Sequence, residues 1–263
     1  MRKRVVLQCS VIALAALIPL AGCVTVPSGE WSTKAQMPTG RWELAICVVD
    51  GKIYAIGGAG PVYEALGTVE VYDPTTDTWA TKSDMPTPRQ GLSASVVDGK
   101  IYAIGGGAGT STSYSTVETF SAVEMYDPDT DTWTTRADMP TSRGYHCANV
   151  VDGKIYVFGG SQNSAPDGTL VPSVEVYDPA TDTWSQVGEM PAPRGAGFSS
   201  AVDGKIYVIG GYGGFDALHE YDPAKDTWTE RTPMPMWRNA HCTSALDGRI
   251  FVIGGYGGTT GYQ

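Results

Sequence analysis

Short apolar runs separated by fixed polar turns follow one another along most of the chain. Apolar residues flank an Asp-Gly pair five times, and the first residues of these pairs are Asp50, Asp98, Asp152, Asp203 and Asp247. A two-residue type I′ turn needs positive φ at both central residues, so Asp-Gly between β-branched runs predicts a β-hairpin. Five such hairpins on one chain predict repeated β-sheet modules.

The segments around the hairpins repeat with constant spacing. Trp31 precedes Asp50 by 19 residues, and the same interval follows Trp79, Trp133, Trp184 and Trp228. The first complete unit predicts four strands, at residues 44–49, 52–56 and 69–72 and from near Trp79 onward. All variation in repeat length falls between a Gly-Gly pair and the third strand, so the pattern indicates a rigid scaffold with one variable loop per unit.

One four-stranded sheet of this size cannot bury both faces, whereas sheets packed radially around an axis do so and leave few open edges. The repeat therefore predicts an all-β propeller of four-stranded blades. Gly57-Gly58, Tyr72-Asp73-Pro74 and a Trp six residues beyond that Asp, with their copies over residues 31–255, resemble kelch repeats. The resemblance implies a kelch-type β-propeller, and its members serve as binding platforms, scaffolds and occasionally enzymes.

The propeller is expected over residues 31–263, with five blades partly or fully represented. The N-terminus would contribute a fourth strand near Trp31, and the last unit contains only its first two strands before Gly254-Gly255. The last blade is therefore expected to be incomplete, and a natural chain that continues beyond Gln263 is one expectation. The alternative is that residues 259–263 supply the third strand after a tight loop.

The N-terminus has the features of an export signal. Arg2, Lys3 and Arg4 precede an apolar run that ends at Leu20. The segment Leu20-Ala21-Gly22-Cys23 resembles the lipobox of bacterial lipoproteins, which implies a signal peptide over 1–22, lipidation of Cys23 and a short linker over 23–30. The expected location is the bacterial cell envelope, outside the cytoplasm and attached through the lipid alone. The alternatives are an ordinary secretory signal and an uncleaved anchor.

Charge and cysteine content narrow the choice of partners. Without the signal, 15 Lys and Arg stand against 28 Asp and Glu, a formal charge of −13, so nucleic acid is not an expected partner. Cys47, Cys147 and Cys242 lie on equivalent strands of non-neighbouring repeats, too far apart for a disulfide among them. We expect them to be buried as small apolar residues.

Strand alternation places the Met-Pro-x-x-Arg segments and the variable loops on one face, while the constant turns lie on the other. Because function concentrates on variable loops held by a rigid frame, the first face is the predicted recognition surface for a protein or a glycan. Five arginines begin the first strands on this face and are candidates for binding a carboxylate or phosphate: Arg41, Arg89, Arg143, Arg194 and Arg238. The alternative is that each ties down its own loop.

Residues on this face that depart from the repeat are further candidates for ligand contacts. They are Trp42, Tyr114, Tyr145, His146, Tyr212, Trp237 and His241. Trp237 could stack on a sugar ring, whereas His146 and His241 occupy a position at which kelch repeats often carry a structural histidine. The variable loops themselves are either ligand contacts or solvated spacers.

No acid–base pair, cofactor motif or metal cluster is evident, so no catalytic residue, cofactor or metal is expected. The segment from Asp127 to Asp131 lacks the glycine and terminal Glu of a calcium loop, and it aligns with ordinary turns. The enzymatic alternative is a resemblance to exported bacterial kelch propellers that epimerise N-acetylneuraminate. It would use charged residues at the channel mouth, among which Arg143, Arg194 and Glu64 are candidates.

Overall fold

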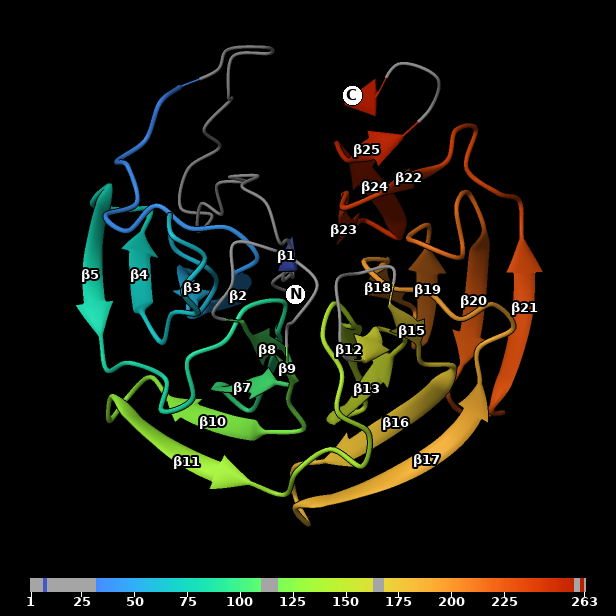
Figure 1. Ribbon diagram of the computed structural model, residues 1–263, viewed down its shortest axis with the longest axis horizontal. Coiled ribbons are helices and arrows are strands. Elements are labelled where there is room, and N and C mark those ends of the chain that lie inside the picture. Colours follow the sequence, from blue (N-terminus) through green and yellow to red (C-terminus); the bar gives the residue numbers. More distant parts are fainter. Residues whose placement is uncertain (1–6, 9–31, 110–117, 163–167, 258–260, 263) are drawn as a thin grey trace.

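The computed structural model describes residues 7–8, 32–109, 118–162, 168–257 and 261–262. Antiparallel four-stranded sheets stand like blades around a central axis, and the described residues leave no complete sheet between β2–β5 and the segment that carries β23 and β24 (Figure 1). The predicted β-propeller of four-stranded blades is confirmed.

Four sheets have all four strands, and each begins at the axis and ends at the periphery. The strands are β2 (Ala45–Val49), β3 (Lys52–Ile56), β4 (Val69–Asp73) and β5 (Thr78–Lys82); β6 (Ser93–Val97), β7 (Lys100–Ile104), β10 (Val123–Asp127) and β11 (Thr132–Arg136); β12 (Cys147–Val151), β13 (Lys154–Phe158), β16 (Ser173–Asp178) and β17 (Thr183–Glu189); and β18 (Phe198–Val202), β19 (Lys205–Ile209), β20 (Leu218–Asp222) and β21 (Thr227–Arg231).

Shorter elements complete the fold. The fifth unit supplies β23 (Cys242–Leu246) and β24 (Arg249–Ile253), and β1 (Leu7–Gln8) pairs with β23. Small ribbons rise from the loops on one face: β8 (Gly107–Ala108) with β9 (Glu118–Thr119), β14 (Ser161–Gln162) with β15 (Thr169–Leu170), and β22 (Arg238–Asn239) with β25 (Tyr256–Gly257) and β26 (Gly261–Tyr262).

The Asp-Gly turns have the expected backbone. Asp50 has φ 48° and Gly51 has φ 78°, and Val49 pairs with Lys52 across the turn. Positive φ at both central residues defines the type I′ turn, which matches the twist of the flanking strands. The four further Asp-Gly pairs also have both φ angles positive, so the five hairpins are confirmed.

The hydrophobic core lies between the blades. Ile56 and Val69 of the first blade share a buried cluster with Ile101 and Tyr126 of the second. Equivalent clusters join the second blade to the third and the third to the fourth. Each blade therefore covers the apolar face of its neighbour, which is why one blade is not stable alone.

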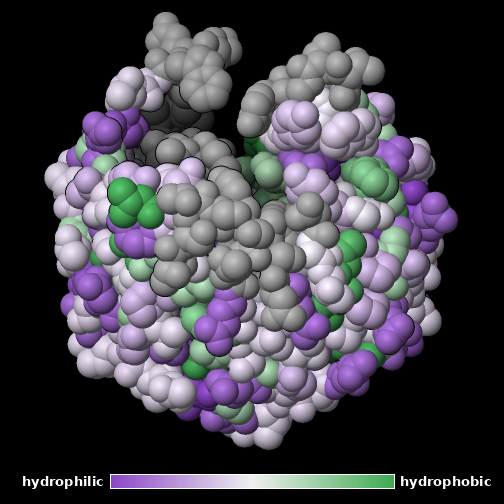
Figure 2. Space-filling model, viewed as in Figure 1, coloured by the Kyte–Doolittle hydropathy of each residue, from purple (hydrophilic) through white to green (hydrophobic). Residues whose placement is uncertain are grey.

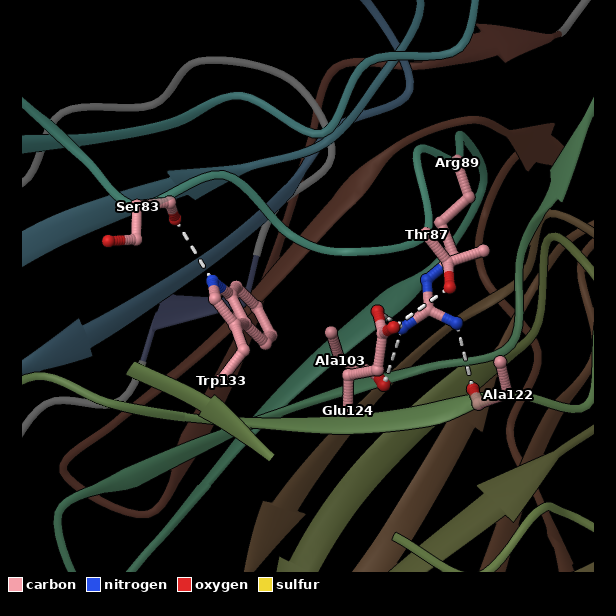
Figure 3. A network of polar contacts seen from close by, with 7 residues as sticks. All are labelled: Ser83, Thr87, Arg89, Ala103, Ala122, Glu124 and Trp133. Atoms are coloured by element: carbon pink, nitrogen blue, oxygen red, sulfur yellow. Dashed lines mark hydrogen bonds and ion pairs between the residues drawn. The ribbon is translucent and has the colours of Figure 1, made fainter. Parts of the chain in front are cut away.

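The repeated Trp fastens adjacent blades at the periphery. Trp133 Nε1 donates a hydrogen bond to the carbonyl of Ser83 in the preceding blade at 2.9 Å (Figure 3). Ser83 N–H donates to Asp131 at 2.9 Å, and Tyr126 OH donates to the same carboxylate at 2.6 Å. The polar residues of the outer turn thus connect two blades as well as closing the turn.

The cysteines and the N-terminal segment were the subject of two further expectations. Cys47, Cys147 and Cys242 are all buried, as expected, and no disulfide joins them to one another. Cys47 and Cys147 are free, whereas Cys242 is disulfide-bonded, which the sequence analysis did not predict. Trp31 and the lipidation site Cys23 lie outside the described residues, and residues 32–37, directly after Trp31, form no strand, so the fourth strand expected there does not extend beyond Trp31.

Candidate functional site: the rim of the variable-loop face

The Gly-Gly pairs bring two kinds of loop onto the same face. Gly58 N–H donates to the carbonyl of Arg89 in the next blade at 2.9 Å, and three further repeats show the same bond. A Cβ on Gly57, whose φ is +64°, would approach that carbonyl to 2.6 Å. The close contact requires glycine, and it places each variable loop beside the Met-Pro-x-x-Arg segment of its neighbour.

The repeated arginines are buried inside the blades. Arg89 has no exposed surface, and it forms an ion pair with Glu124 of β10 at 3.0 Å. It also donates to the carbonyls of Ala103 at 3.1 Å and Ala122 at 3.0 Å (Figure 3). Burial lowers the pKa of the Arg89 guanidinium to about 10, against the opposing effect of the Glu124 carboxylate.

The same pair recurs in two other blades, as Arg41 with Glu70 at 3.1 Å and Arg143 with Glu175 at 2.9 Å. In the fourth blade, Arg194 instead donates to Nδ1 of His219 at 2.8 Å. These four guanidinium groups form their polar contacts within their own blades and do not point to the surface of the rim. The alternative stated above, that each arginine ties down its loop, is the arrangement in the structure.

Both predicted histidines are buried too. His146 Nε2 lies 2.9 Å from Ser93 Oγ of the neighbouring blade. In the equivalent place His241 faces the ring of Phe198, with centroids 5.0 Å apart, and neither of its ring nitrogens has a hydrogen-bond partner among the described residues. Burial lowers the pKa of His146 to about 3 and that of His241 to about 4, with further lowering by Arg143 and Arg238 respectively.

A chain of backbone hydrogen bonds lines the channel mouth. Gly91 N–H donates to Glu43 at 2.9 Å, Tyr145 to Gly91 at 2.8 Å, Ala196 to Tyr145 at 2.9 Å and Ala240 to Ala196 at 3.4 Å. Each residue stands two positions after a repeated Arg and has φ between 46° and 62°. This left-handed conformation lets each of these residues bond to its equivalent in the next blade. The resulting ring of backbone bonds through residues 43, 91, 145, 196 and 240 is called the girdle, and it fixes the shape of the channel mouth.

Glu43 and Tyr145 meet across this mouth. Tyr145 OH donates to Glu43 Oε2 at 2.8 Å, joining the first blade to the third. Burial raises the pKa of the Glu43 carboxyl, while the hydrogen bond from Tyr145 lowers it. The pair therefore links two non-adjacent blades across the girdle.

Apolar side chains are exposed around the same rim. Trp42 meets Tyr63 edge-on at 5.4 Å, and Trp237 meets Phe215 at 6.4 Å and Tyr256 at 6.1 Å. Six large hydrophobic residues in the rim loops are exposed: Val62, Tyr63, Tyr212, Phe215, Met236 and Tyr256. In Figure 2, green apolar residues are set among pale and purple ones on the surface.

The predicted residues thus separate into two groups. Trp42, Tyr145, Tyr212 and Trp237 lie on the rim, whereas the arginines Arg41, Arg89, Arg143 and Arg194 and the two histidines are buried. Tyr114 lies outside the described residues. Arg238 is partly exposed and donates to the carbonyl of Gly254 at 3.0 Å.

Sequence reasoning missed other rim residues, namely Glu43, Tyr63, Phe215, Met236 and Tyr256. A bulky residue within five positions of a Gly-Gly pair was the available signal for Phe215 and Tyr256. No local signal marks Glu43, because its partner Tyr145 is two repeats away in the sequence.

The part of the chain that the structure describes lacks a metal-binding cluster and a membrane-spanning helix. That part contains no group of three His, Cys, Asp or Glu side chains placed to hold a metal ion. It also contains no helix with the length and apolarity needed to cross a membrane.

Models of two known protein families match the repeats of this chain. The model of the Kelch motif matches residues 43–86 and 88–140, and that of the KLHDC2/KLHL20/DRC7 Kelch-repeats domain matches residues 134–255. The two models together follow the described blades from the first to the fifth. This chain is a kelch-repeat β-propeller.

Individual relatives agree with this assignment. Kelch-like protein terF of Aspergillus terreus is 33% identical over 193 residues, 71% of this chain and 42% of that protein. Beta-scruin of Limulus polyphemus is 37% identical over 83 residues, 32% of this chain and 9% of that protein. This kelch propeller therefore spans less than half the length of either relative, and both come from eukaryotes.

Among solved structures, the one titled "Structure of YjhT" superimposes with a TM-score of 0.76 over 89% of this chain and 82% of that chain. The sequences are 17% identical, so the likeness concerns the fold. The kelch-type propeller predicted from the doublets is confirmed.

Proposed function

We propose that this kelch propeller is an interaction module whose ligand, a protein or a glycan, binds the rim of the variable-loop face. The observation that carries the proposal is the set of exposed Tyr, Phe and Met side chains in the rim loops, beside the partly exposed Trp42 and Trp237. Such residues dominate the energetics of protein interfaces. Among glycan contacts, the ring of Trp237 is the one best suited to stacking on a sugar.

The ligand test compares variants of the rim with a variant of the constant face. Binding is measured on a glycan array and by cross-linked capture from a bacterial envelope fraction. Trp237→Ala and Phe215→Ala are each expected to weaken binding about tenfold or more, because truncating a hot-spot aromatic costs over 1–2 kcal/mol. Thr130→Ala, in an exposed turn of the opposite face, is the control. Equal binding by all variants would place the ligand elsewhere.

We propose in addition that the propeller is anchored outside the cytoplasm through a lipid on Cys23, in the bacterial cell envelope. The proposal rests on the N-terminal sequence alone, from the basic residues through the apolar run to Leu20-Ala21-Gly22-Cys23. Cleavage before Cys23 would remove β1, so the mature protein would lack the pairing of Leu7–Gln8 with β23. Labelling with a fatty-acid analogue in a bacterial host tests it. Incorporation that Cys23→Ser abolishes is expected, and an unlabelled, membrane-free product would contradict it.

A carbohydrate-active enzyme is the second candidate function, and Glu43 with Tyr145 is the observation that favours it. A carboxyl whose pKa is raised and which accepts a bond from a phenol at a channel mouth has the properties of a general acid or base. Arg143 and Arg194, the other candidates, are buried within their blades, so the proposal rests on Glu43 and Tyr145. Mutarotation of N-acetylneuraminate, lost in Glu43→Gln, is the expected result; no turnover by the parent protein would exclude this activity.

A further inference from the structure

The girdle carries two large polar side chains, those of Glu43 and Tyr145. Its other members are Gly91, Ala196 and Ala240, whose side chains extend no further than a methyl group. None of the five residues is fully buried, so solvent reaches the girdle at the channel mouth. Glu43 and Tyr145 therefore determine the polar chemistry of the mouth.

Both residues have a backbone conformation that long side chains seldom adopt. Glu43 and Tyr145 each have φ 55°, whereas Gly91 has φ 62° at the equivalent position without the strain that a side chain adds. The Tyr145 ring lies against Gly91, where a Cβ would come within 3.3 Å of Cε1, and so extends past the second blade to Glu43. Gly91 makes the girdle bonds with no side chain at all, so those bonds do not explain the two large residues.

Glu43 has no cationic partner in the described part of the chain. Its Oε2 accepts the hydrogen bond from Tyr145 OH at 2.8 Å. Burial raises the pKa of its carboxyl, opposed by that hydroxyl but by no positive charge of the described residues. The buried Glu70, Glu124 and Glu175 each pair with an arginine instead. Because a partly buried carboxylate without a counter-charge is costly, a cation supplied by a ligand would stabilise its charged form.

The variable loops beside the mouth are acidic. The four loops together contain four Asp or Glu residues and no Lys or Arg. They are residues 59–68, 107–122, 161–173 and 212–217. The arginines that begin the first strands of the complete blades are held inside those blades. Since a cleft surrounded by one sign of charge concentrates ligands of the opposite sign, this face favours a cation over an anion.

We propose that the channel mouth binds the cationic end of a lysine or arginine side chain of a protein partner. The cation pairs with the Glu43 carboxylate, and the aliphatic stem of the same side chain packs on the Tyr145 ring. The inference deepens the interaction proposed above and rests on it for the face on which the partner binds. It adds a chemical requirement, a basic residue at the centre of the contact.

A protein partner fits this arrangement better than an amino sugar does. The exposed Tyr, Phe and Met side chains of the rim are of the kind enriched in protein interfaces. A partner that lies on this rim can extend one long side chain to the centre, and the stem then has apolar surface to cover. An amino sugar carries its ammonium group directly on the ring and lacks such a stem.

The test titrates the full protein, isotope-labelled for NMR, with N-acetyl-lysine N-methylamide and follows the amide signals of Gly91 and Ala196. Saturable shifts are expected. The matching norleucine compound, which keeps the stem and lacks the ammonium, should bind about tenfold more weakly or worse. Glu43→Gln keeps an acceptor for Tyr145, removes the charge and should weaken lysine binding by a similar factor. Glu230→Gln, an exposed carboxylate on β21, is the matched control and should leave it unchanged.

Three results would overturn the proposal: no saturable shift of the girdle amides, equal affinity for the lysine and norleucine compounds, or unchanged lysine binding by Glu43→Gln. The comparison of the two compounds needs no variant, so it decides the matter even where Glu43→Gln does not fold. Tighter binding of glucosamine than of the lysine compound would assign the site to an amino sugar and overturn the choice of partner. Phe215→Ala, on the rim, should leave lysine binding intact, so failure at the mouth is distinguishable from failure of the rim proposal.

Discussion

At the scale of single residues, one buried ion pair explains why the same arginine returns in every repeat. The Arg89 guanidinium bonds to Glu124 and to two carbonyls from different strands, so one side chain joins the loop, the second strand and the third strand of a blade. A charge this deeply buried is tolerated only when it is paired and hydrogen-bonded. The arginine therefore stabilises the blade.

Removing the carboxylate tests this role. Glu124→Ala would leave Arg89 buried without its counter-charge, and we expect a loss of about 3–5 kcal/mol in the free energy of unfolding, measured with urea. The exposed Glu230→Ala provides the control and should change stability by less than about 0.5 kcal/mol. Similar losses for the two variants would contradict the structural role.

In the fourth blade the carboxylate is absent and can be added instead of removed. His219 takes the place of Glu and leaves Arg194 paired with a neutral ring, and burial together with the Arg194 charge lowers the pKa of His219. His219→Glu restores the charge of the other blades, and we expect a gain of about 0.5–2 kcal/mol, in the range of repeat-consensus substitutions. A lower melting temperature would show that this blade has repacked around the histidine.

At the scale of the elements, the outer turns connect neighbouring blades through the Trp indoles. Trp133 and Trp184 donate to carbonyls of the preceding blade, and Trp79 donates to the carbonyl of Ala35 in the segment before the first blade, at 2.8–2.9 Å. Trp228 Nε1 has no such acceptor among the described residues. The preceding strand β17 is longer, ends at Glu189 and has a register shift near Ser173, so the loop that offers the acceptor elsewhere is altered.

Equivalent substitutions at Trp133 and Trp228 test how much the indole hydrogen bond contributes to stability. Trp133→Phe removes the indole bond but keeps an aromatic ring against Tyr126, and we expect a loss of about 1 kcal/mol beyond that of Trp228→Phe, which loses no such bond. Trp133→Ala should cost about 3–5 kcal/mol. Urea unfolding of the three variants measures their free energies of unfolding. Equal losses of this free energy in the two Phe variants would mean that the indole hydrogen bond of Trp133 adds no stability.

At the scale of the whole molecule, the buried histidines make stability depend on pH. His146 and His241 stay neutral in the folded protein because their pKa values are lowered to about 3 and about 4, whereas an unfolded histidine titrates near 6.5. Between these values the unfolded chain binds more protons than the folded one. Stability is therefore present above about pH 6.5 and is lost as pH falls.

The expected loss on moving from pH 7.5 to pH 5 is about 2 kcal/mol for each of these two histidines. Urea unfolding at the two pH values measures it. His146→Gln should make the curve flatter, by removing one proton-binding site from the unfolded state. Equal stability at the two pH values would show that the rings are accessible to water and titrate normally.

The amino-acid sequence by itself determined the strands, the turns and the period of this protein. Asp-Gly turns, apolar alternation and the Tyr-Asp-Pro and Trp doublets act over a few neighbouring residues, and radial packing is the arrangement that buries such sheets. The face that carries the variable loops also followed, because strands alternate in direction.

Only the tertiary structure decided which of those repeated residues reach solvent. Arg89 and His146 look like rim residues in the sequence, yet partners 35 and 53 positions away hold them inside. Glu43 meets Tyr145 across 102 residues, and Arg238 differs from its equivalents because no third strand among the described residues supplies its carboxylate. These outcomes depend on contacts between residues far apart in the sequence, within a blade or between blades, and a local pattern does not encode such contacts.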